Sequence, residues 1–193
     1  GMSSLRVVAI VQARLGSTRL PRKSLADIAG RPMVIRVLDR AAAMLDREHV
    51  VLAVPHGDTE LVVLAHDYGY ASYRGIGPDD DVLRRYADFA AVFGADIVVR
   101  VTGDCPLFCP ETGRSVIDIF LATSPTVEYA SNVGPGTDGL DVEVLWRHIL
   151  REASDHAKAR EDREHVTPFI RRCANRIYVR DPAGTPDDLD VSV

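Results

Sequence analysis

The sequence predicts an α/β protein, a three-layer α/β/α sandwich whose central sheet is mostly parallel. Short runs of β-branched and other apolar residues, such as 7–11 and 96–101, are typical of strands that are buried on both faces of a parallel sheet. Segments with apolar residues at helical spacing alternate with these runs along the chain. That alternation is the order that parallel strands joined by crossover helices require.

The elements of the first half follow from this pattern in turn. After the first strand, apolar residues recur at helical spacing over 32–46. The apolar run 49–54 predicts a second buried strand. A helix is expected over 58–68, where Gly69 gives the stop signal, and a short strand follows at 71–73.

The second half continues the pattern and ends in a long charged region. Residues 140–145 alternate apolar and acidic side chains with a period of two, which predicts a strand. Residues 146–174 have a helical pattern. The other elements expected in this half are a helix at 82–93, a strand at 96–101, a helix at 110–122, a short strand at 127–130, a turn-rich loop at 181–188 and a final strand at 189–193.

Length and charge restrict the class of protein. The 193 residues, of which 46% are hydrophobic, are expected to form one globular domain over 1–193. The net charge of −5 argues against a nucleic-acid binder with a broad basic surface, although it is compatible with a local cationic pocket for an anionic small ligand. Because no apolar stretch of about 18 or more residues occurs, we expect a cytoplasmic protein without membrane insertion.

The loop after the first strand concentrates cationic side chains. In parallel sheets, ligands bind beyond the carboxyl ends of the strands. This loop holds a glycine, two hydroxyl groups and four cationic residues, which are Arg14, Arg19, Arg22 and Lys23. Guanidinium forks, an ammonium charge and free backbone N–H groups suit a polyphosphate. A solvated basic loop is the alternative, and neither a G-x-G-x-x-G pattern nor a P-loop pattern is present.

The stretch Q-A-R-x-G-S-T-R-L-P-x-K-x-L, which begins at Gln12, resembles the N-terminal signature of sugar nucleotidyltransferases that use CTP. It is most similar to the spore coat polysaccharide biosynthesis protein F branch of the cytidylyltransferases, and later segments match the same family in the same order. The resemblance implies a Rossmann-like nucleotide-diphospho-sugar transferase fold. It also implies transfer of CMP from CTP to a sugar acid or sugar phosphate for cell-surface polysaccharide synthesis.

The same resemblance assigns roles to the residues of this first segment. Arg14 and Lys23 would be catalytic, because they would hold and neutralise the triphosphate while the acceptor attacks its α-phosphorus. No residue of the sequence stands out as a general base. The nucleotide-binding residues implied here are Gln12, Ala13, Arg14, Gly16, Ser17, Arg19 and Lys23.

The second matching segment, Y-R-G-x-x-x-D-D-D-V-L-R-R-Y, lies between the third strand and the next helix. By resemblance, Arg74 and Arg85 border the base and ribose of the nucleotide, whereas Arg85 is otherwise a helix-surface charge. The acids 79–81 are expected to occupy the first turn of the helix that follows, where the helix dipole favours them.

The third segment, R-V-T-G-D-C-P-L, follows the strand at 96–101. Asp104 is the position at which the family binds its divalent metal, so the resemblance implies that Asp104 holds Mg²⁺ and is catalytic. The alternative for this carboxylate is an Asx-turn or a helix cap.

The last two matches concern the acceptor. The segment N-V-x-x-x-x-x-D-G-L-D-V-E-V implies that Asp141 and Glu143 face the sugar, whereas outward-facing acids on a half-exposed strand are the alternative. R-E-H-V-T-P-F-I implies that His165 contacts the substrate, against a capping or solvated role. In the family, this helical region also contacts a second subunit, so the resemblance implies a homodimer.

Two other function classes fit part of this pattern. One is a catalytically silent subunit that binds a nucleotide or glycan. The other is a metal-dependent glycosyltransferase, although Gly103-Asp104-Cys105 lacks the second acid of an Asp-x-Asp pair. Relatives carry a further metal-binding Asp just after a late strand, and here the sequence ends at Val193. We therefore expect that this chain lacks the family's C-terminal end and turns over poorly.

Overall fold

The computed structural model describes residues 4–16, 22–102, 106–107, 109–132, 142–179 and, for its backbone, 189–192. Within this part of the chain, eight strands form one sheet in the order β10-β9-β7-β8-β6-β1-β4-β5. Their bounds are β1 Val7–Gln12, β4 Val50–Pro55, β5 Ala71–Gly75, β6 Ile97–Thr102, β7 Tyr129–Ser131, β8 Val142–Trp146, β9 Arg176–Val179 and β10 Leu189–Ser192.

Most of these strands run in one direction. β1 is parallel to both of its neighbours, β4 and β6. β4 is also parallel to β5, and β7 is parallel to β9. β8 is antiparallel to both of its neighbours, β6 and β7, and β10 is antiparallel to β9. The predicted mostly parallel α/β sheet is confirmed, with these two strands reversed. β7 ends at Ser131 and β8 begins at Val142, which is a shorter connection than the dozen or so residues that a parallel crossover needs, so these two strands pair antiparallel.

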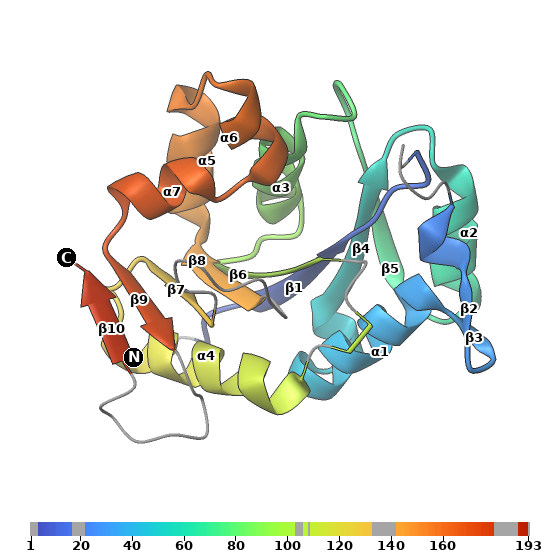
Figure 1. The fold of residues 1–193 in the computed structure, drawn as a ribbon, viewed down its shortest axis with the longest axis horizontal. Coiled ribbons are helices and arrows are strands. Elements are labelled where there is room, and N and C mark those ends of the chain that lie inside the picture. The colour runs from blue at the N-terminus through green and yellow to red at the C-terminus, as the bar shows by residue number, and fades with distance from the viewer. Residues whose placement is uncertain are drawn as a thin grey trace.

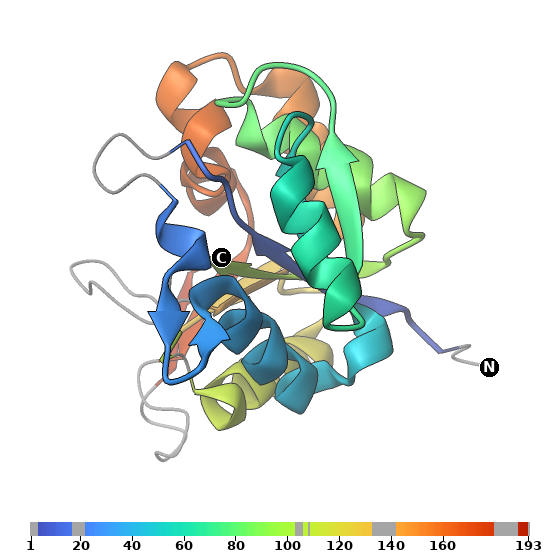
Figure 2. The ribbon, with the colours of Figure 1, turned by 90° about the vertical axis from the view of Figure 1, so that its right-hand side faces the viewer.

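Helices cover both faces of the sheet. Figure 1 shows α1 and α4 on one side and α3, α5, α6 and α7 on the other, and Figure 2 shows α2 beside the edge strand β5. The helices are α1 Met33–Leu45, α2 Thr59–Asp67, α3 Val82–Val92, α4 Pro110–Thr123, α5 Arg147–His156, α6 Arg160–His165 and α7 Pro168–Cys173. The short elements are the 3-10 helices η1 Lys23–Leu25 and η2 Arg47–His49 and the two-stranded ribbon β2 Asp27–Ile28 with β3 Arg31–Pro32.

The apolar run of β1 is buried on both faces, as the sequence predicts. Ala9 and Val11 pack into the core beneath α1, α2 and α4, whereas Val8 and Ile10 pack into the core beneath α3, α5 and α7. Each of these four side chains is at most 1% exposed. β1 therefore lies in the interior of the sheet, and its carboxyl end lies between the carboxyl ends of β4 and β6.

Two local expectations differ from the structure. The charged region 146–174 forms three short helices rather than one long one, because α6 ends at a positive φ at Val166 and Pro168 begins α7. The helix expected to carry three carboxylates in its first turn begins after them, at Val82. Asp81 is its N-cap and accepts a hydrogen bond from the backbone N–H of Arg84 at 3.3 Å.

The described helices were also considered as membrane spans. None of them combines the length and the apolar character that crossing a membrane needs.

Candidate functional site

A cleft lies at the carboxyl ends of β1 and β6, where Gln12 and Thr102 are cross-strand neighbours. Its first lobe has a volume of about 300 Å³ and its second lobe a volume of about 370 Å³. Arg100, Thr102 and His165 line both lobes, so the two are adjacent parts of one cleft. This is the position at which open α/β sheets bind ligands.

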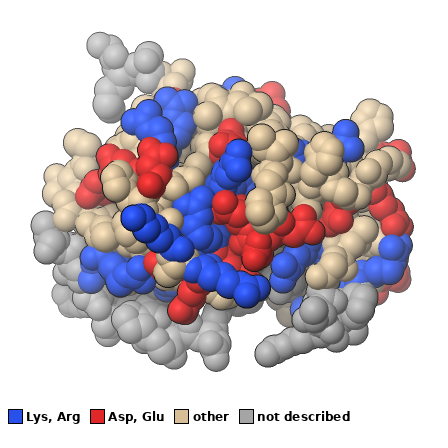
Figure 3. Space-filling view, turned by 90° about the horizontal axis from the view of Figure 1, so that it is seen from above, with Lys and Arg blue, Asp and Glu red and all other residues tan. Residues whose placement is uncertain are grey.

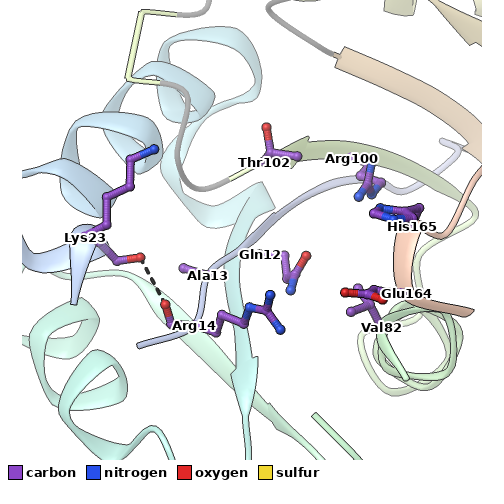
Figure 4. A pocket seen from close by; sticks show the side chains of 10 residues that line it. Gln12, Ala13, Arg14, Lys23, Val82, Arg100, Thr102, Glu164 and His165 are labelled. Atoms are coloured by element: carbon purple, nitrogen blue, oxygen red, sulfur yellow. Dashed lines mark hydrogen bonds between the residues drawn. The ribbon is translucent and has the colours of Figure 1, made fainter. Parts of the chain in front are cut away.

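One side of the first lobe is basic. Arg14 follows β1 directly, and Lys23 comes from η1 across the loop that begins at Gly16. In Figure 4 the Arg14 side chain extends into the space below Gln12, while Lys23 stands farther out on the same side. Two cationic residues therefore line a cavity large enough for a small anionic ligand.

The base of this loop is held by contacts that leave Arg14 in the cleft. The backbone N–H of Leu15 donates to the Asp58 carboxylate at 2.8 Å, and the backbone N–H of Arg22 donates to the Leu15 carbonyl at 3.0 Å. The Arg22 guanidinium contacts the Glu60 carboxylate at 2.6 and 2.8 Å. Arg22, one of the four cations of the loop, is thus engaged by α2.

The opposite wall of the first lobe comes from two helices. Val82 begins α3, and Glu164 with His165 ends α6. Figure 4 shows these side chains across the cavity from Lys23, with Arg14 between them and Gln12 behind. The wall is built from segments about 80 residues apart in the sequence, so its presence depends on the packing of α6 against α3.

An ion pair forms the floor between the two lobes. The Arg100 Nη1 and Glu143 Oε1 atoms are 2.6 Å apart, and the side chains are 13% and 6% exposed. Arg100 and Glu143 are direct cross-strand partners on β6 and β8, and the Tyr129 hydroxyl on β7 donates to the same carboxylate. Solvent exposure, the alternative for Glu143, is wrong, because Glu143 is only 5% exposed and its carboxylate contacts Arg100 and Tyr129.

The ion pair shifts the ionisation of its members. Burial by itself raises the pKa of Glu143, but the positive charge of Arg100 and hydrogen bonds from Tyr129, Thr167 and Arg100 outweigh it and lower the pKa overall. Burial would lower the pKa of Arg100, and the Glu143 carboxylate raises it instead. Burial also raises the pKa of Tyr86, whose ring lies 5.5 Å from the Arg100 Cζ atom, to about 12. The floor therefore holds one compensated charge pair at neutral pH.

A strained turn separates His165, the last residue of α6, from Thr167, which precedes α7. Val166 has φ 70° and ψ −57°, and the Thr167 N–H donates to the His165 carbonyl at 2.8 Å. This is a γ-turn with a positive central φ, a conformation that β-branched residues rarely adopt. Because Val166 is fully buried, its packing holds the turn. His165 lines both lobes, and Thr167 lines the second.

Arg85 lies buried beside the first lobe. It is 2% exposed, its Nη2 donates to the Asp79 carbonyl at 2.9 Å, and its Nη1 has no hydrogen-bond partner among the described residues. Burial lowers the pKa of Arg85, and the positive charge of Arg14 acts in the same direction. A helix-surface position, the alternative for Arg85, is therefore wrong. Gly75 makes room for it, since a Cβ there would lie 2.5 Å from Arg85 Cγ.

Gly75→Ala is accordingly expected to lower the free energy of unfolding by about 1–3 kcal/mol, the usual cost of overpacking a well-filled core. Denaturant unfolding measures it. Gly57→Ala is the control, because a Cβ at Gly57 meets nothing within 4 Å. The double variant Gly75→Ala/Arg85→Ala should recover part of the loss. Equal stability of the Gly75 and Gly57 variants would contradict the tight contact between Gly75 and Arg85.

The structure brings only some of the predicted site residues together. Gln12, Ala13, Arg14, Lys23 and His165 line the first lobe, and Glu143 lines the second. Arg74 is exposed on β5 and Gly16 is exposed in the loop, and neither is among the lining residues. The predicted site residues Ser17, Arg19, Asp104 and Asp141 lie outside the described part of the chain.

The sequence did not predict several of the lining residues, among them Arg100, Thr102, Glu164 and Arg171. Arg100 and Thr102 belong to the matched segment around Asp104, but only Asp104 was assigned a role. Glu164 is the neighbour of His165, and Arg171 lies one turn beyond Pro168. The one available signal was Arg100 itself, a charge in an otherwise apolar strand, which needs a partner when buried.

The cleft was also assessed as a magnesium site. Among the described residues, no group of three or more His, Cys, Asp or Glu side chains is placed to hold a metal. Mg²⁺ needs only one or two carboxylates when phosphate oxygens supply other ligands. Thr102, which lines the cleft two residues before Asp104, and Glu164 across the first lobe offer the hard oxygen atoms that this ion prefers. The donor chemistry of the described cleft fits Mg²⁺.

The surrounding surface carries charges of both signs. Figure 3 shows clusters of Lys and Arg side chains next to clusters of Asp and Glu on the face seen from above. Exposed ion pairs also occur at α3 and α6, where Arg84 and Asp88 are 3.5 Å apart and Arg160 of α6 lies 3.7 Å from Asp80, just before α3. On this face, positive charge is therefore local rather than spread over the surface.

Comparison with known proteins identifies a matching protein family. A model of a family described as cytidylyltransferase matches residues 8–186. The chain is 30% identical over 168 residues to an uncharacterized protein of Methanocaldococcus jannaschii, covering 86% of this chain and 67% of that protein. It is 38% identical over 119 residues to the 3-deoxy-manno-octulosonate cytidylyltransferase of Brucella ovis, covering 60% of this chain. The chain spans about half of that relative, 47% of its length.

Solved structures show the same fold. A cytidylyltransferase from Leptospira borgpetersenii superposes with a TM-score of 0.81 at 28% identity, over 88% of this chain and 72% of that one. A CMP:2-keto-3-deoxy-manno-octonic acid synthetase, solved in complex with CTP, gives a TM-score of 0.72 at 19% identity, over 89% of this chain and 88% of that one. At the lower identity the likeness concerns the fold alone.

Proposed function

The chain belongs to the cytidylyltransferase family, and from this premise we propose that it transfers CMP from CTP to a sugar acid or sugar phosphate. CTP-dependent nucleotidyl transfer is the activity of the family. The observation that carries the proposal for this chain is the basic side of the first lobe, which Arg14 and Lys23 line near the carboxyl end of β1. That geometry favours a polyanion in the first lobe.

We propose that the triphosphate of CTP lies against Arg14, Lys23 and Arg19. In the reaction, an acceptor oxygen attacks the α-phosphorus, the bond from that phosphorus to the bridging oxygen breaks, and pyrophosphate leaves. Such transfers depend on positioning and on neutralising charge more than on covalent help from the protein. The two described cations would therefore hold the triphosphate in line with the acceptor and neutralise the leaving group.

The remaining nucleotide contacts are proposals of the same kind. Gln12, Ala13, Gly16 and Ser17 are assigned to the nucleotide, and Arg85 and Arg74 to its base and ribose. Support is strongest for Arg85, which is buried and whose Nη1 has no hydrogen-bond partner in the part of the chain that the structure describes. Arg74 has the least support, because it is exposed outside the lining of the cleft.

Mg²⁺ is part of the proposal through Asp104. When bound, Mg²⁺ supplies charge neutralisation on phosphate oxygens. Asp104 would hold the ion, with Thr102 and Glu164 offering oxygen atoms in the described cleft. The ordinary requirement of one or two protein carboxylates is met by this set.

The second lobe is proposed as the acceptor site. Glu143 and His165 line it together with Thr167 and Arg171, and Asp141 is assigned to the same substrate by resemblance. A hydroxyl-rich, anionic acceptor suits this mixture of charged and hydroxyl groups. A role in cell-surface or spore coat polysaccharide synthesis and assembly as a homodimer are further proposals that rest on the family resemblance.

CTP with Mg²⁺ is expected to raise the melting temperature more than ATP or GTP with Mg²⁺. A ligand that binds only the folded state adds about 2.7 kcal/mol at a hundredfold excess over Kd. Equal shifts for all three nucleotides would contradict the CTP assignment. Pyrophosphate release from CTP with a panel of sugar acids and sugar phosphates then identifies the acceptor. Binding without turnover would indicate a silent subunit, and sugar release from a nucleotide-sugar would indicate a glycosyltransferase.

A further inference from the structure

One largely buried arginine joins α6 to the beginning of α3. The Arg163 Nε atom donates to Asp81 Oδ1 at 2.9 Å, and Nη2 donates to Asp81 Oδ2 at 3.2 Å. Its Nη1 donates to the carbonyl oxygens of Ser154, at 2.5 Å, and Ala157, at 3.1 Å. The Arg163 and Asp81 side chains are only 19% and 21% exposed. A single guanidinium therefore ties together α3, the end of α5, and α6.

The position of this ion pair in the sequence relates it to the cleft. Asp81 immediately precedes Val82, and Arg163 immediately precedes Glu164 and His165. Those three following residues form the wall of the first lobe opposite Arg14. Successive residues of a helix point about 100° apart, so Arg163 can face α3 while its two successors face the cleft. The pair joins the two halves of this wall directly behind the side chains that line it.

The helix that carries Arg163 depends on such contacts. α6 spans only Arg160–His165, and an isolated helix of this length is not stable in water. Its far end is fixed by the turn at Val166 and by the contact between Thr167 and Glu143. Among the described residues, two ion pairs join α6 to the two acids that precede α3. They are the largely buried Arg163–Asp81 pair and the exposed Arg160–Asp80 pair.

We propose that Arg163 is a positioning residue for nucleotide binding. Through its two-pronged contact with Asp81, it sets the separation between Val82 and the pair Glu164 and His165, and thereby the width of the first lobe. A role limited to stability is the alternative. The inference deepens the proposed function and rests on it for the identity of the nucleotide.

Arg163→Lys and Asp81→Asn test the proposal. Lysine keeps the positive charge but cannot reproduce the planar fork, and asparagine keeps an oxygen that caps α3. Each variant is expected to raise the Kd for CTP about tenfold, and the double variant should be no weaker than either single one, because both remove the same contact. KM for CTP should rise more than kcat falls.

Arg160→Gln is the matched control. It removes the neighbouring ion pair between α6 and Asp80, whose side chains are 82% and 47% exposed and whose closest atoms are 3.7 Å apart. This variant should bind CTP as the wild type does. The proposal is overturned if folded Arg163→Lys and Asp81→Asn proteins also keep the wild-type Kd and lose only thermal stability.

A second readout does not depend on which nucleotide binds. The NMR signal of the His165 ring should shift in Arg163→Lys, whereas that of His49, on the opposite end of the sheet, should not. If the wild type prefers another nucleoside triphosphate, the CTP assignment fails and the same Kd comparison with that triphosphate still decides the role of Arg163. If no nucleoside triphosphate binds, the proposed function fails and the role of Arg163 in nucleotide binding is overturned with it.

Discussion

Glu143→Gln is expected to lower the free energy of unfolding by about 3–5 kcal/mol, because it leaves the Arg100 guanidinium buried without a counter-charge. The two side chains are only 13% and 6% exposed, and their closest atoms are 2.6 Å apart. Glutamine has nearly the same shape, so the loss reports the missing charge rather than a cavity. Denaturant unfolding at neutral pH measures it.

The control for this substitution is an ion pair on the surface. Arg114 and Asp118 are 3.2 Å apart on α4, with side chains 52% and 59% exposed. Asp118→Asn should therefore cost no more than about 0.5 kcal/mol, since exposed pairs one helical turn apart contribute little. If Glu143→Gln and Asp118→Asn lowered the free energy of unfolding by similar amounts, the burial of the Arg100–Glu143 pair would be contradicted.

The same carboxylate gives the ion pair a pH dependence. The pKa of Glu143 is lowered from its ordinary value of 4.5 in the folded state. A lowered pKa contributes stability that is present above the unfolded-state pKa and is lost as pH falls toward the folded-state pKa. The stability gap between wild type and Glu143→Gln should therefore narrow as pH falls below about 4.5. A gap that stays constant into that range would contradict the direction of the shift.

Arg14→Ala and Lys23→Ala are expected to weaken CTP binding by about ten- to a hundredfold each, because a hydrogen bond to a charged group contributes about 1.5–3 kcal/mol. Titration calorimetry with CTP and Mg²⁺ measures the change. The melting temperature without ligand should change little for Arg14→Ala, because Arg14 is exposed and substitutions at such positions usually stay within about 0.5 kcal/mol.

Two further arginines serve as comparisons. Arg114→Ala removes an exposed charge of α4, outside the lining of the cleft, and should leave CTP binding unchanged apart from general electrostatics. Arg22→Ala removes a cation of the same loop that Glu60 already engages, so its effect on CTP should be smaller than that of Arg14→Ala. If the Arg14 variant loses no affinity, or if it unfolds, the basic side of the first lobe does not hold the triphosphate.

Local patterns predicted most of the fold. The strand at 96–101 and the helix at 110–122 correspond to β6 at Ile97–Thr102 and α4 at Pro110–Thr123, within one residue at each end. Such segments are determined by the alternation or helical spacing of their own side chains. The break between the short helices α6 and α7 was not predicted, because apolar residues keep their helical spacing across it. The positive φ of Val166 is held by buried tertiary packing, which the spacing of apolar residues does not show.

The candidate site was predicted in part, for the same reason. The basic loop stood out because its cations are adjacent in the sequence, yet nothing local distinguished Arg14, which lines the cleft, from Arg22, which Glu60 binds from 38 residues away. Likewise, the alternation of β8 placed Glu143 on one face of a strand without indicating what that face meets. Its partner Arg100 lies 43 residues earlier.

The sequence by itself determined the α/β class, the order of the elements and the basic loop at the end of the first strand, because each depends on residues within one segment. The tertiary structure alone decided that β8 inserts antiparallel between β6 and β7. That insertion buries Glu143 against Arg100, and the packing of α6 on α3 closes the cleft opposite Arg14. Burial and charge pairing between distant segments arise only when the core is assembled, so they cannot be predicted from the residues of a single segment.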